Sequence, residues 1–300
     1  MKRQGLQRAV ALVALACALT ACGTLSVDDE KKLGAQYQAE LRKQLVFVRD
    51  PVTVNYVRQF GLQLASSARP SPFDFRFYVV ENEEINAFAI PGGAVYVNTG
   101  LLQKVHNGAE LAAVLSHEMG HVTARHMAKR VNKERGTGFV VQAFYLAVAI
   151  LTGNPYLANA GGIAGQVAGQ AFMSTFSRDD EREADALGME TMVAAGWNPN
   201  GMVTMFETLK KEGGGGSGMP QFLASHPATD ERIRTAREMA EKYPDADKLR
   251  LVDPKLPIIQ ERLKLIIGTD REKEDESDGE KDDEHEKKGD KGGGESDDDE

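Results

Sequence analysis

The hydrophobic positions at the start of the chain follow first a helical pattern and then an extended one. Residues 26–45 mix polar and apolar residues with helical character. A second helix is predicted to begin at Asp50-Pro51, because Asp is a preferred N-cap and Pro fits the first helical position. The segment Arg69-Pro70-Ser71-Pro72 ends this helix, since proline cannot continue it.

Three extended segments follow and predict a small β-sheet. In the first, apolar residues occupy every second position, as in a strand with one buried face: Phe73, Phe75, Phe77 and Val79. The other two segments, residues 85–90 and 94–97, are joined by Pro91-Gly92-Gly93, which is a hairpin-like signal.

A long helix is predicted next. Asn107 can cap it with Glu110 three residues later, and an apolar stripe continues to about Lys133. Residues 138–151 are nearly all apolar but fall short of the ~20 residues of a transmembrane helix, so we interpret them as a helix that is buried or leans on a membrane. The spacing of Gly161, Gly165 and Gly169 indicates close helix packing.

The C-terminal half adds further helices. Ser177 caps one with Asp180 at its third position, and this helix is expected to end at Gly196. Another should begin after Asn198-Pro199, and the last should run from Thr229 to about Tyr243. The fold class is therefore predicted to be α+β and mainly helical.

The N-terminus has the pattern of an export signal. A basic stretch precedes an apolar run at residues 9–19, and small residues then lead to Cys22, as in the lipobox of bacterial lipoproteins. We predict a signal peptide at residues 1–21 and lipidation of Cys22; the alternative is an ordinary signal peptide with an incidental cysteine. Because Cys17 would leave with the signal, the mature domain would contain neither a free thiol nor a disulfide. Gly23 favours the outer membrane by resemblance, so we expect an outer-membrane lipoprotein of the cell envelope facing the periplasm.

The negative charge is concentrated in a C-terminal tail. The formal net charge is −9, but residues 270–300 contain 17 Asp and Glu against 6 Lys and Arg, which leaves about +2 for residues 1–269. The tail is too polar to fold, and we predict either a solubilising extension or an electrostatic arm. No basic patch points to nucleic acid. The expected organisation is a lipidated segment at 22–50, a catalytic domain at 51–250, an extension at 251–269 and the acidic tail.

One motif carries recognisable chemistry. Histidines four residues apart on a helix point the same way, so His117 and His121 can bind one zinc ion. Glu118 lies about 100° around the helix and can reach a zinc-bound water as general base. A surface helix facing water is the alternative, but apolar neighbours such as Leu115 and Met119 favour burial, where these groups need a partner or a metal.

A third ligand is expected from the helix that Ser177 caps. Glu181 and Asp185 lie one turn apart, so one can bind the metal while the other accepts an N–H from a ligating histidine. Glu183 is offset by two positions and is expected to point elsewhere. His106, His126 and His285 have no partner at a useful spacing, and we assign them no function.

Taken together, these motifs resemble a known family. His-Glu-x-x-His followed by Ser-Arg-x-x-Glu-x-Glu-Ala-Asp is similar to the pattern of the HtpX/BepA-like zinc metallopeptidases, relatives of the CAAX prenyl protease. The similarity spans about residues 30–245 and includes Asn86 to Gly93, Gly100-Leu101-Leu102, and Ser225 to Thr229 with Arg232-Ile233.

The resemblance implies roles for individual residues in a gluzincin-type protease domain, with the small sheet beside the active-site helix. His117, His121 and Glu181 would bind one zinc ion per chain, Glu118 would be the general base, and Asp185 would orient a ligating histidine. His226 would approach the zinc, either to plug the site or to steady the oxyanion.

The expected activity is zinc-dependent endopeptidase cleavage of unfolded or misassembled envelope proteins. Membrane-embedded relatives have several transmembrane helices that this chain lacks, which favours a soluble, periplasm-facing lipoprotein branch and favours envelope proteins over prenylated substrates. An edge strand at Gly93, Ala94, Val95 and Tyr96 is predicted to align an extended substrate. Outer-membrane assembly machinery is a further expected partner. The alternatives are a non-proteolytic chaperone or assembly factor, and a hydrolase of small molecules or cell-wall peptides.

Overall fold

The structure is a computed structural model that describes residues 25–133, 176–213 and 220–267. The chain divides into two compact units, Met1–Leu256 and Pro257–Glu300. The first unit contains all the elements that build the site, and in the second unit residues 257–267 are helical. The predicted signal peptide, Cys22, the apolar run at 138–151, the three spaced glycines and the acidic tail lie outside the described residues.

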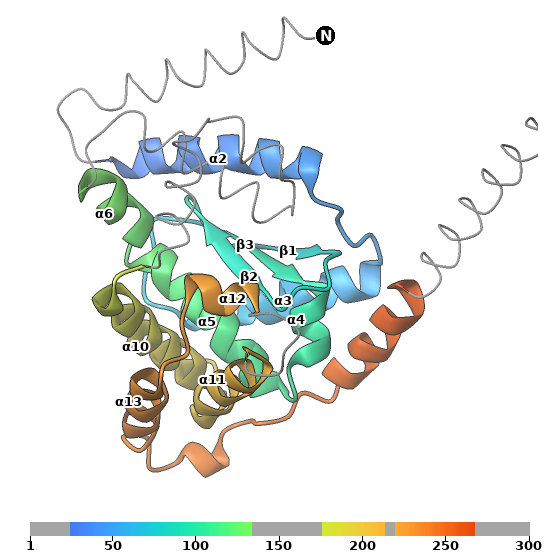
Figure 1. Ribbon diagram of the computed structural model, residues 1–300, viewed down its shortest axis with the longest axis vertical. Coiled ribbons are helices and arrows are strands. Elements are labelled where there is room, and N and C mark those ends of the chain that lie inside the picture. Colours follow the sequence, from blue (N-terminus) through green and yellow to red (C-terminus); the bar gives the residue numbers. More distant parts are fainter. Residues whose placement is uncertain (1–24, 134–175, 214–219, 268–300) are drawn as a thin grey trace, which may run out of the picture. The chain divides into compact units, whose positions relative to one another are not determined.

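Figure 1 shows the first unit as helices gathered around a small sheet. Within the described ranges, its elements are α2 (Val27–Gln44), α3 (Pro51–Ser67), β1 (Arg76–Val80), β2 (Ala87–Ile90), β3 (Ala94–Asn98), α4 (Thr99–Lys104), α5 (Gly108–Thr123), α6 (His126–Lys133), α10 (Arg178–Ala194), α11 (Asn200–Gly213), α12 (Gln221–Ser225), α13 (Asp230–Ala240) and a short 3-10 turn, Ala246–Lys248. The mainly helical α+β prediction is confirmed. None of these described helices has the length and apolarity needed to cross a bilayer.

Helix starts follow the capping chemistry written in the sequence. The Asp50 carboxylate accepts the backbone N–H of Thr53 at the start of α3, with Pro51 in the first turn. Ser177 and Asp180 form a complete capping box at the start of α10. These caps fix where α3 and α10 begin.

The sheet has the strand order β1-β3-β2, with β3 parallel to β1 and antiparallel to β2. The predicted hairpin is confirmed, and Gly92 and Gly93 provide its turn at φ +84° and +92°, a region that glycine favours. The predicted edge strand is wrong. Residues 94–98 are all buried and bonded on both sides, because β1 pairs with the strand that composition alone marked as an edge. In the order β1-β3-β2, the outer strand next to β3 at the end of the hairpin is β2.

The predicted continuous helix from Asn107 to Lys133 is also wrong. α5 ends at Thr123, α6 begins at His126, and Arg125 between them adopts φ +56°. The Arg125 guanidinium donates to the Glu30 carboxylate over 2.8 Å and to the Leu25 carbonyl over 2.7 Å. These contacts hold a conformation that costs a non-glycine residue roughly 1–2 kcal/mol.

The N-terminal helix α2 packs on the sheet. Leu41 joins a buried cluster with Ile90 and Tyr96, and Tyr37 packs against it. The approach is close, since a Cβ on Gly34 would lie 1.8 Å from the carbonyl oxygen of Pro91. In Figure 1, α2 runs across the end of the hairpin. The segment before Asp50 therefore covers apolar surface of the sheet.

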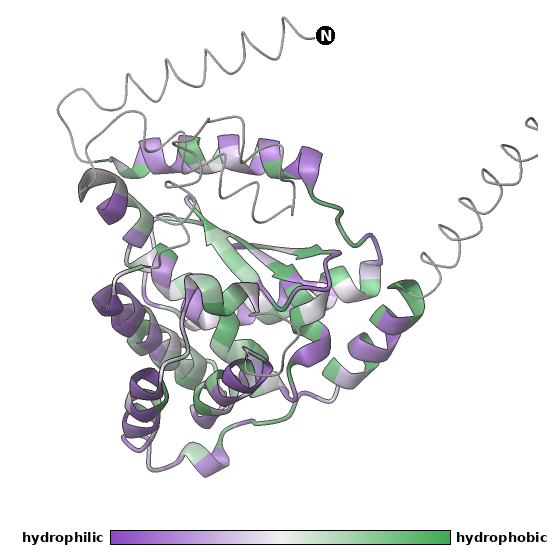
Figure 2. Ribbon diagram, in the orientation of Figure 1, coloured by the Kyte–Doolittle hydropathy of each residue, from purple (hydrophilic) through white to green (hydrophobic). Residues whose placement is uncertain are grey.

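Helices α5 and α10 form the centre of the first unit. Nearly every residue of α5 is buried, and Figure 2 shows its apolar character against the hydrophilic outer faces of α10 and α13. Two glycines let the backbones approach: a Cβ on Gly120 would lie 2.7 Å from the Ala184 carbonyl oxygen, and one on Gly188 would lie 3.0 Å from the His117 nitrogen. This close contact brings the acidic residues of α10 to the histidines of α5.

Candidate metal centre

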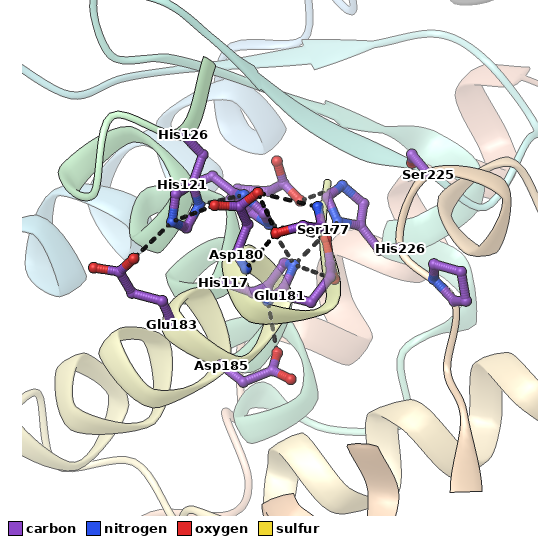
Figure 3. Close-up of polar contacts among 12 residues, drawn as sticks. His117, His121, His126, Ser177, Asp180, Glu181, Glu183, Asp185, Ser225 and His226 are labelled. Atoms are coloured by element: carbon purple, nitrogen blue, oxygen red, sulfur yellow. Dashed lines mark hydrogen bonds and ion pairs between the residues drawn. The ribbon is translucent and has the colours of Figure 1, made fainter. Parts of the chain in front are cut away.

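Four side chains from three elements meet at one buried point. His117 and His121 come from α5, Glu181 from α10, and His226 from the residue that follows α12. Each offers one ligand atom, and these atoms all lie within 4.8 Å of one another. Figure 3 shows the four groups turned toward one another. The structure thus places the three predicted ligands together and adds His226 as a fourth donor.

His117 is oriented by Asp185. The Nδ1 atom of His117 lies 2.8 Å from the Asp185 carboxylate, so the proton of the ring sits on Nδ1 and Nε2 carries a lone pair. That Nε2 atom lies 3.0 Å from Nε2 of His121 and 3.2 Å from Nδ1 of His226. Asp185 therefore occupies the place that the sequence motif predicts for a partner of a ligating histidine.

The chemistry of this donor set fits a metal ion. Imidazole nitrogens with converging lone pairs and a carboxylate, all buried, repel one another or lack partners unless a cation lies between them. Nitrogen and carboxylate donors of this number are those of zinc sites. The residues that would hold zinc are His117, His121 and Glu181, with His226 in reach of the remaining position.

Arg232 of α13 neutralises the two buried carboxylates of α10. It donates through Nε and Nη2 to both oxygens of Asp185, over 2.8 and 2.7 Å, and Nη1 lies 2.7 Å from Glu181. Burial alone would raise the pKa of Asp185, but the charge of Arg232 and the hydrogen bond from His117 hold it below its ordinary value. Burial likewise opposes ionisation of Glu181, but the positive charge of His226 and the hydrogen bond from its Nδ1 hold the pKa of Glu181 far below the ordinary value. Both groups are anions at neutral pH.

Glu118 is tied to the sheet by one oxygen. The backbone N–H of Ala89 in β2 donates to Oε2 of Glu118 over 2.9 Å. The other oxygen, Oε1, has no hydrogen-bond partner among the described residues and lies 3.5 Å from Nε2 of His226. Burial raises the pKa of Glu118, against the charges of His226 and His117. A buried carboxylate with a raised pKa and one free oxygen is suited to accept a proton.

His226 contacts both acidic members of the site. Its Nδ1 lies 2.8 Å from Glu181, and its side chain is buried. Burial lowers the pKa of His226, but the carboxylates of Glu181 and Glu118 outweigh this effect and raise it above the ordinary value. The structure thus brings His226 to the metal ligands, as the resemblance implies.

Three further residues at the site were missed or undervalued from sequence. His126 lies against His121, Arg232 holds the acidic pair, and Glu183, which points away from the metal ligands as expected, reaches His126. Arg232 is part of the quoted Ser225 to Ile233 similarity, which was a usable signal. His126 carried none, because its contact depends on the break between α5 and α6.

Comparison with known proteins agrees with this geometry. The profile of Peptidase family M48 matches residues 51–240. The chain belongs to this family. The M48 match covers the sheet, the two histidines of α5, the acidic residues of α10, and His226.

Several curated relatives support the assignment. The M48 chain is 32% identical over 222 residues to the beta-barrel assembly-enhancing protease of Yersinia pestis, covering 74% of this chain and 46% of the relative. It is 28% identical over 222 residues to the mitochondrial metalloendopeptidase OMA1 of Schizosaccharomyces pombe, covering 71% and 62%. Metalloprotease LoiP of Escherichia coli is 32% identical over 184 residues, covering 58% and 66%. The chain spans about half the length of the assembly-enhancing protease.

Proposed function

We propose that this M48 protein is a zinc metalloendopeptidase that cleaves unfolded or misassembled proteins of the cell envelope. The observation that carries the proposal is the buried meeting of two histidines and a glutamate with Glu118 beside them. Membership of a peptidase family, one relative named as a protease and two named as a metalloendopeptidase and a metalloprotease support the same reaction. One zinc ion per chain is the proposed cofactor, held by His117, His121 and Glu181.

The residues divide the work of peptide hydrolysis. When bound, zinc supplies Lewis acidity toward the scissile carbonyl and the attacking water. Glu118 takes a proton from this water and passes it to the leaving amine, so no covalent acyl-enzyme forms. The Ala89 N–H holds the base in place through Oε2 and leaves Oε1 for the proton. Asp185 and Arg232 keep the Nδ1 proton on His117 and the two carboxylates ionised.

The edge of β2 is the proposed alignment surface for substrate. Ala89 directs its N–H away from β3 toward Glu118, and Ala87, two residues earlier, shares that outward orientation. An extended peptide pairing with this edge would pass beside the general base. Segments that are unfolded or in loops can adopt this conformation, which suits an endopeptidase of misassembled proteins.

The envelope location rests on the sequence and on the relatives' names. The lipobox-like segment supports a lipid anchor at Cys22 and a place on the periplasmic face of the outer membrane. The name of the Yersinia pestis relative, beta-barrel assembly-enhancing protease, supports envelope proteins as substrates and the outer-membrane assembly machinery as partner. The proposed mature organisation remains a lipidated segment at 22–50, the protease domain at 51–250, an extension at 251–269 and the acidic tail.

One observation favours a second function. With His226 the site has four protein donors, and catalytic zinc sites keep their fourth position for water. A latent protein that uses its cleft to bind envelope proteins without cleaving them would have this closed arrangement. In the protease, His226 would either leave this position when substrate enters or stay beside the metal to steady the oxyanion.

The two functions are separated by zinc content and by cleavage of an unfolded protein substrate. We expect wild type to hold one zinc and to cleave, Glu118→Gln to hold zinc without cleaving, and a chelator to stop cleavage. His226→Ala should cleave faster than wild type if His226 closes the site, and more slowly if it steadies the oxyanion. If wild type and His226→Ala both bind zinc but neither cleaves the substrate, the protease function is refuted and the binding function takes its place.

A further inference from the structure

His126 lies outside the metal-binding motif but against one of its histidines. It is 1% exposed, and its Nδ1 lies 2.9 Å from Nδ1 of His121. The two rings meet edge to face, with centroids 4.9 Å apart at 74°. Figure 3 shows His126 between His121 and Glu183. Among the described residues at the site, it is the imidazole behind a ligand, on the side away from the metal.

The break after α5 creates this contact. On one continuous helix, a residue five positions after His121 would lie about 140° around the axis and could not meet its ring. Arg125 instead reverses the backbone at φ +56°, and α6 then starts with His126 facing back toward α5. Glu30 and the Leu25 carbonyl hold Arg125 in this conformation. The strained turn at Arg125, held by Glu30 and Leu25, thus places the His126 side chain against His121.

The hydrogen bonds fix a single arrangement of protons. Nε2 of His121 faces Nε2 of His117 and lies 3.4 Å from Glu181, so it is the metal-facing atom. Its Nδ1 therefore carries the proton and donates to Nδ1 of His126. The proton of His126 must then be on Nε2, which lies 3.1 Å from the Glu183 carboxylate. The Asp180 carboxylate lies farther from the same nitrogen, at 3.5 Å, so Glu183 is its nearer acceptor.

The two ligating histidines consequently have different supports. His117 donates directly to the Asp185 carboxylate, whereas His121 donates to a neutral imidazole that is itself held by Glu183. Lys129 approaches the same Glu183 oxygen over 2.9 Å and keeps the carboxylate in place. Any buried histidine needs hydrogen-bond partners, but here the partner of His126 Nδ1 is the ring of a proposed metal ligand.

We propose that His126 is a positioning residue for the metal site, which fixes the ring orientation and the protonated nitrogen of His121, with Glu183 fixing His126 in turn. The inference rests on the proposed function, since it needs His121 to be a metal ligand. It assigns roles to two residues that the binding motif does not include. It also gives a purpose to the turn at Arg125.

The test compares two amide replacements with opposite geometry. Asn places its carbonyl oxygen where Nδ1 of His126 accepts, whereas Gln reaches toward Glu183 and leaves His121 without an acceptor. Loss of a hydrogen-bond partner of a metal ligand typically weakens metal binding 10–100-fold, so we expect about that loss in His126→Gln and His126→Ala and about threefold or less in His126→Asn. Zinc affinity is measured by competition with a chromophoric chelator. The visible absorption of the cobalt-substituted protein should change in His126→Gln and stay near wild type in His126→Asn.

A second pair of variants tests the same role without changing the buried His126, whose substitution could prevent folding. The Glu183 side chain is 49% exposed, so Glu183→Ala should fold and lose zinc affinity by about two- to fivefold, the range of partly exposed ion pairs. Glu190→Ala, on the same helix and in an ion pair with Arg69, is the matched control and should bind zinc as wild type does.

The outcomes separate this inference from the proposed function. Wild-type protein that binds no zinc would overturn the proposed function. Wild-type protein that binds zinc, with folded His126→Gln binding as tightly, would overturn the positioning role alone. If His126→Gln does not fold, Glu183→Ala decides, and an affinity equal to that of Glu190→Ala would refute the role.

Discussion

The backbone N–H of Ala89 in β2 donates to the carboxylate of Glu118 in α5 over 2.9 Å. The β2 edge that is proposed to align the substrate therefore also provides the N–H that orients Glu118, the proposed base. Movement of β2 would displace both together, so the position of this strand should control the chemical step as well as binding.

Ala89→Pro tests this link, because proline has no N–H to donate. The substitution removes no bond within the sheet, since this N–H points away from β3. A hydrogen bond to a charged group contributes about 1.5–3 kcal/mol, so we expect kcat to fall roughly 10- to 100-fold with zinc content unchanged. Steady-state cleavage kinetics and metal analysis provide the measurement. The control is Phe88→Pro, whose N–H faces β3 by the alternation of the strand and whose loss should unfold the protein. An unchanged kcat in folded Ala89→Pro would disprove the role.

Gly120→Ala should separate the two helices that carry the ligands. The new methyl group would lie 2.7 Å from the Ala184 carbonyl oxygen, so α10 must shift and take Glu181 with it. We expect a loss of about 1–3 kcal/mol in the free energy of unfolding, together with weaker zinc binding. Gly196→Ala is the control, since its cost arises from φ +81° after α10, where a Cβ would make only ordinary contact with the Arg250 guanidinium at 3.6 Å. It should lower stability while leaving zinc affinity unchanged. Equal zinc affinity in both variants would argue against this account.

Arg232→Ala should be strongly destabilising. It leaves the buried carboxylates of Asp185 and Glu181 without their cation, and breaking a buried pair costs about 3–5 kcal/mol. Arg232→Lys should recover only part of the loss, because an ammonium cannot bind both oxygens of Asp185 in the planar arrangement of a guanidinium. Urea unfolding of the metal-free proteins measures both effects. A loss below about 1 kcal/mol for Arg232→Ala would exclude a buried ion pair of this importance.

Glu30 should make stability depend on pH. Burial raises its pKa above the ordinary 4.5, against the hydrogen bond and charge of Arg125. The folded state therefore binds this proton more tightly than the unfolded chain does, so the group's favourable contribution is complete below pH 4.5 and is lost as pH rises through the folded pKa. Glu30→Gln does not titrate. The free energy of unfolding of Glu30→Gln relative to wild type should accordingly increase from pH 4 to pH 7 in urea titrations. A constant difference, or one that decreases, would contradict the raised pKa.

Local chemistry made much of this structure predictable. Asp50 and Ser177 fix helix starts through hydrogen bonds to residues three positions away, and Gly92-Gly93 fixes the hairpin turn. The spacing of His117 and His121 on one helix face likewise needs no tertiary information. The spacing of Glu181 and Asp185 left open which of them binds the metal and which accepts an N–H from a ligating histidine. The family resemblance was needed to assign the first role to Glu181 and the second to Asp185.

Features that depend on distant contacts were not predictable in this way. Composition marked residues 93–96 as an edge strand, but the position of this strand is set by β1, which pairs with it from the other side. The break at Arg125 has no Gly or Pro to announce it, because its conformation is held by Glu30 and Leu25, about a third of the chain away in sequence. His126 could not be placed without that break.

The docking of α2 bears on how short a self-standing fragment of this protein can be. The family profile begins at residue 51, yet α2 covers the apolar cluster around Tyr96, and Leu25 and Glu30 supply the contacts of Arg125. A fragment trimmed to residue 51 would expose aromatic surface and release the turn that places His126. We expect such a fragment to aggregate or to bind zinc weakly. A fragment that starts at Leu25 should stay soluble and bind zinc as the full chain does. The N-terminal helix is thus part of the smallest unit that can fold around its metal.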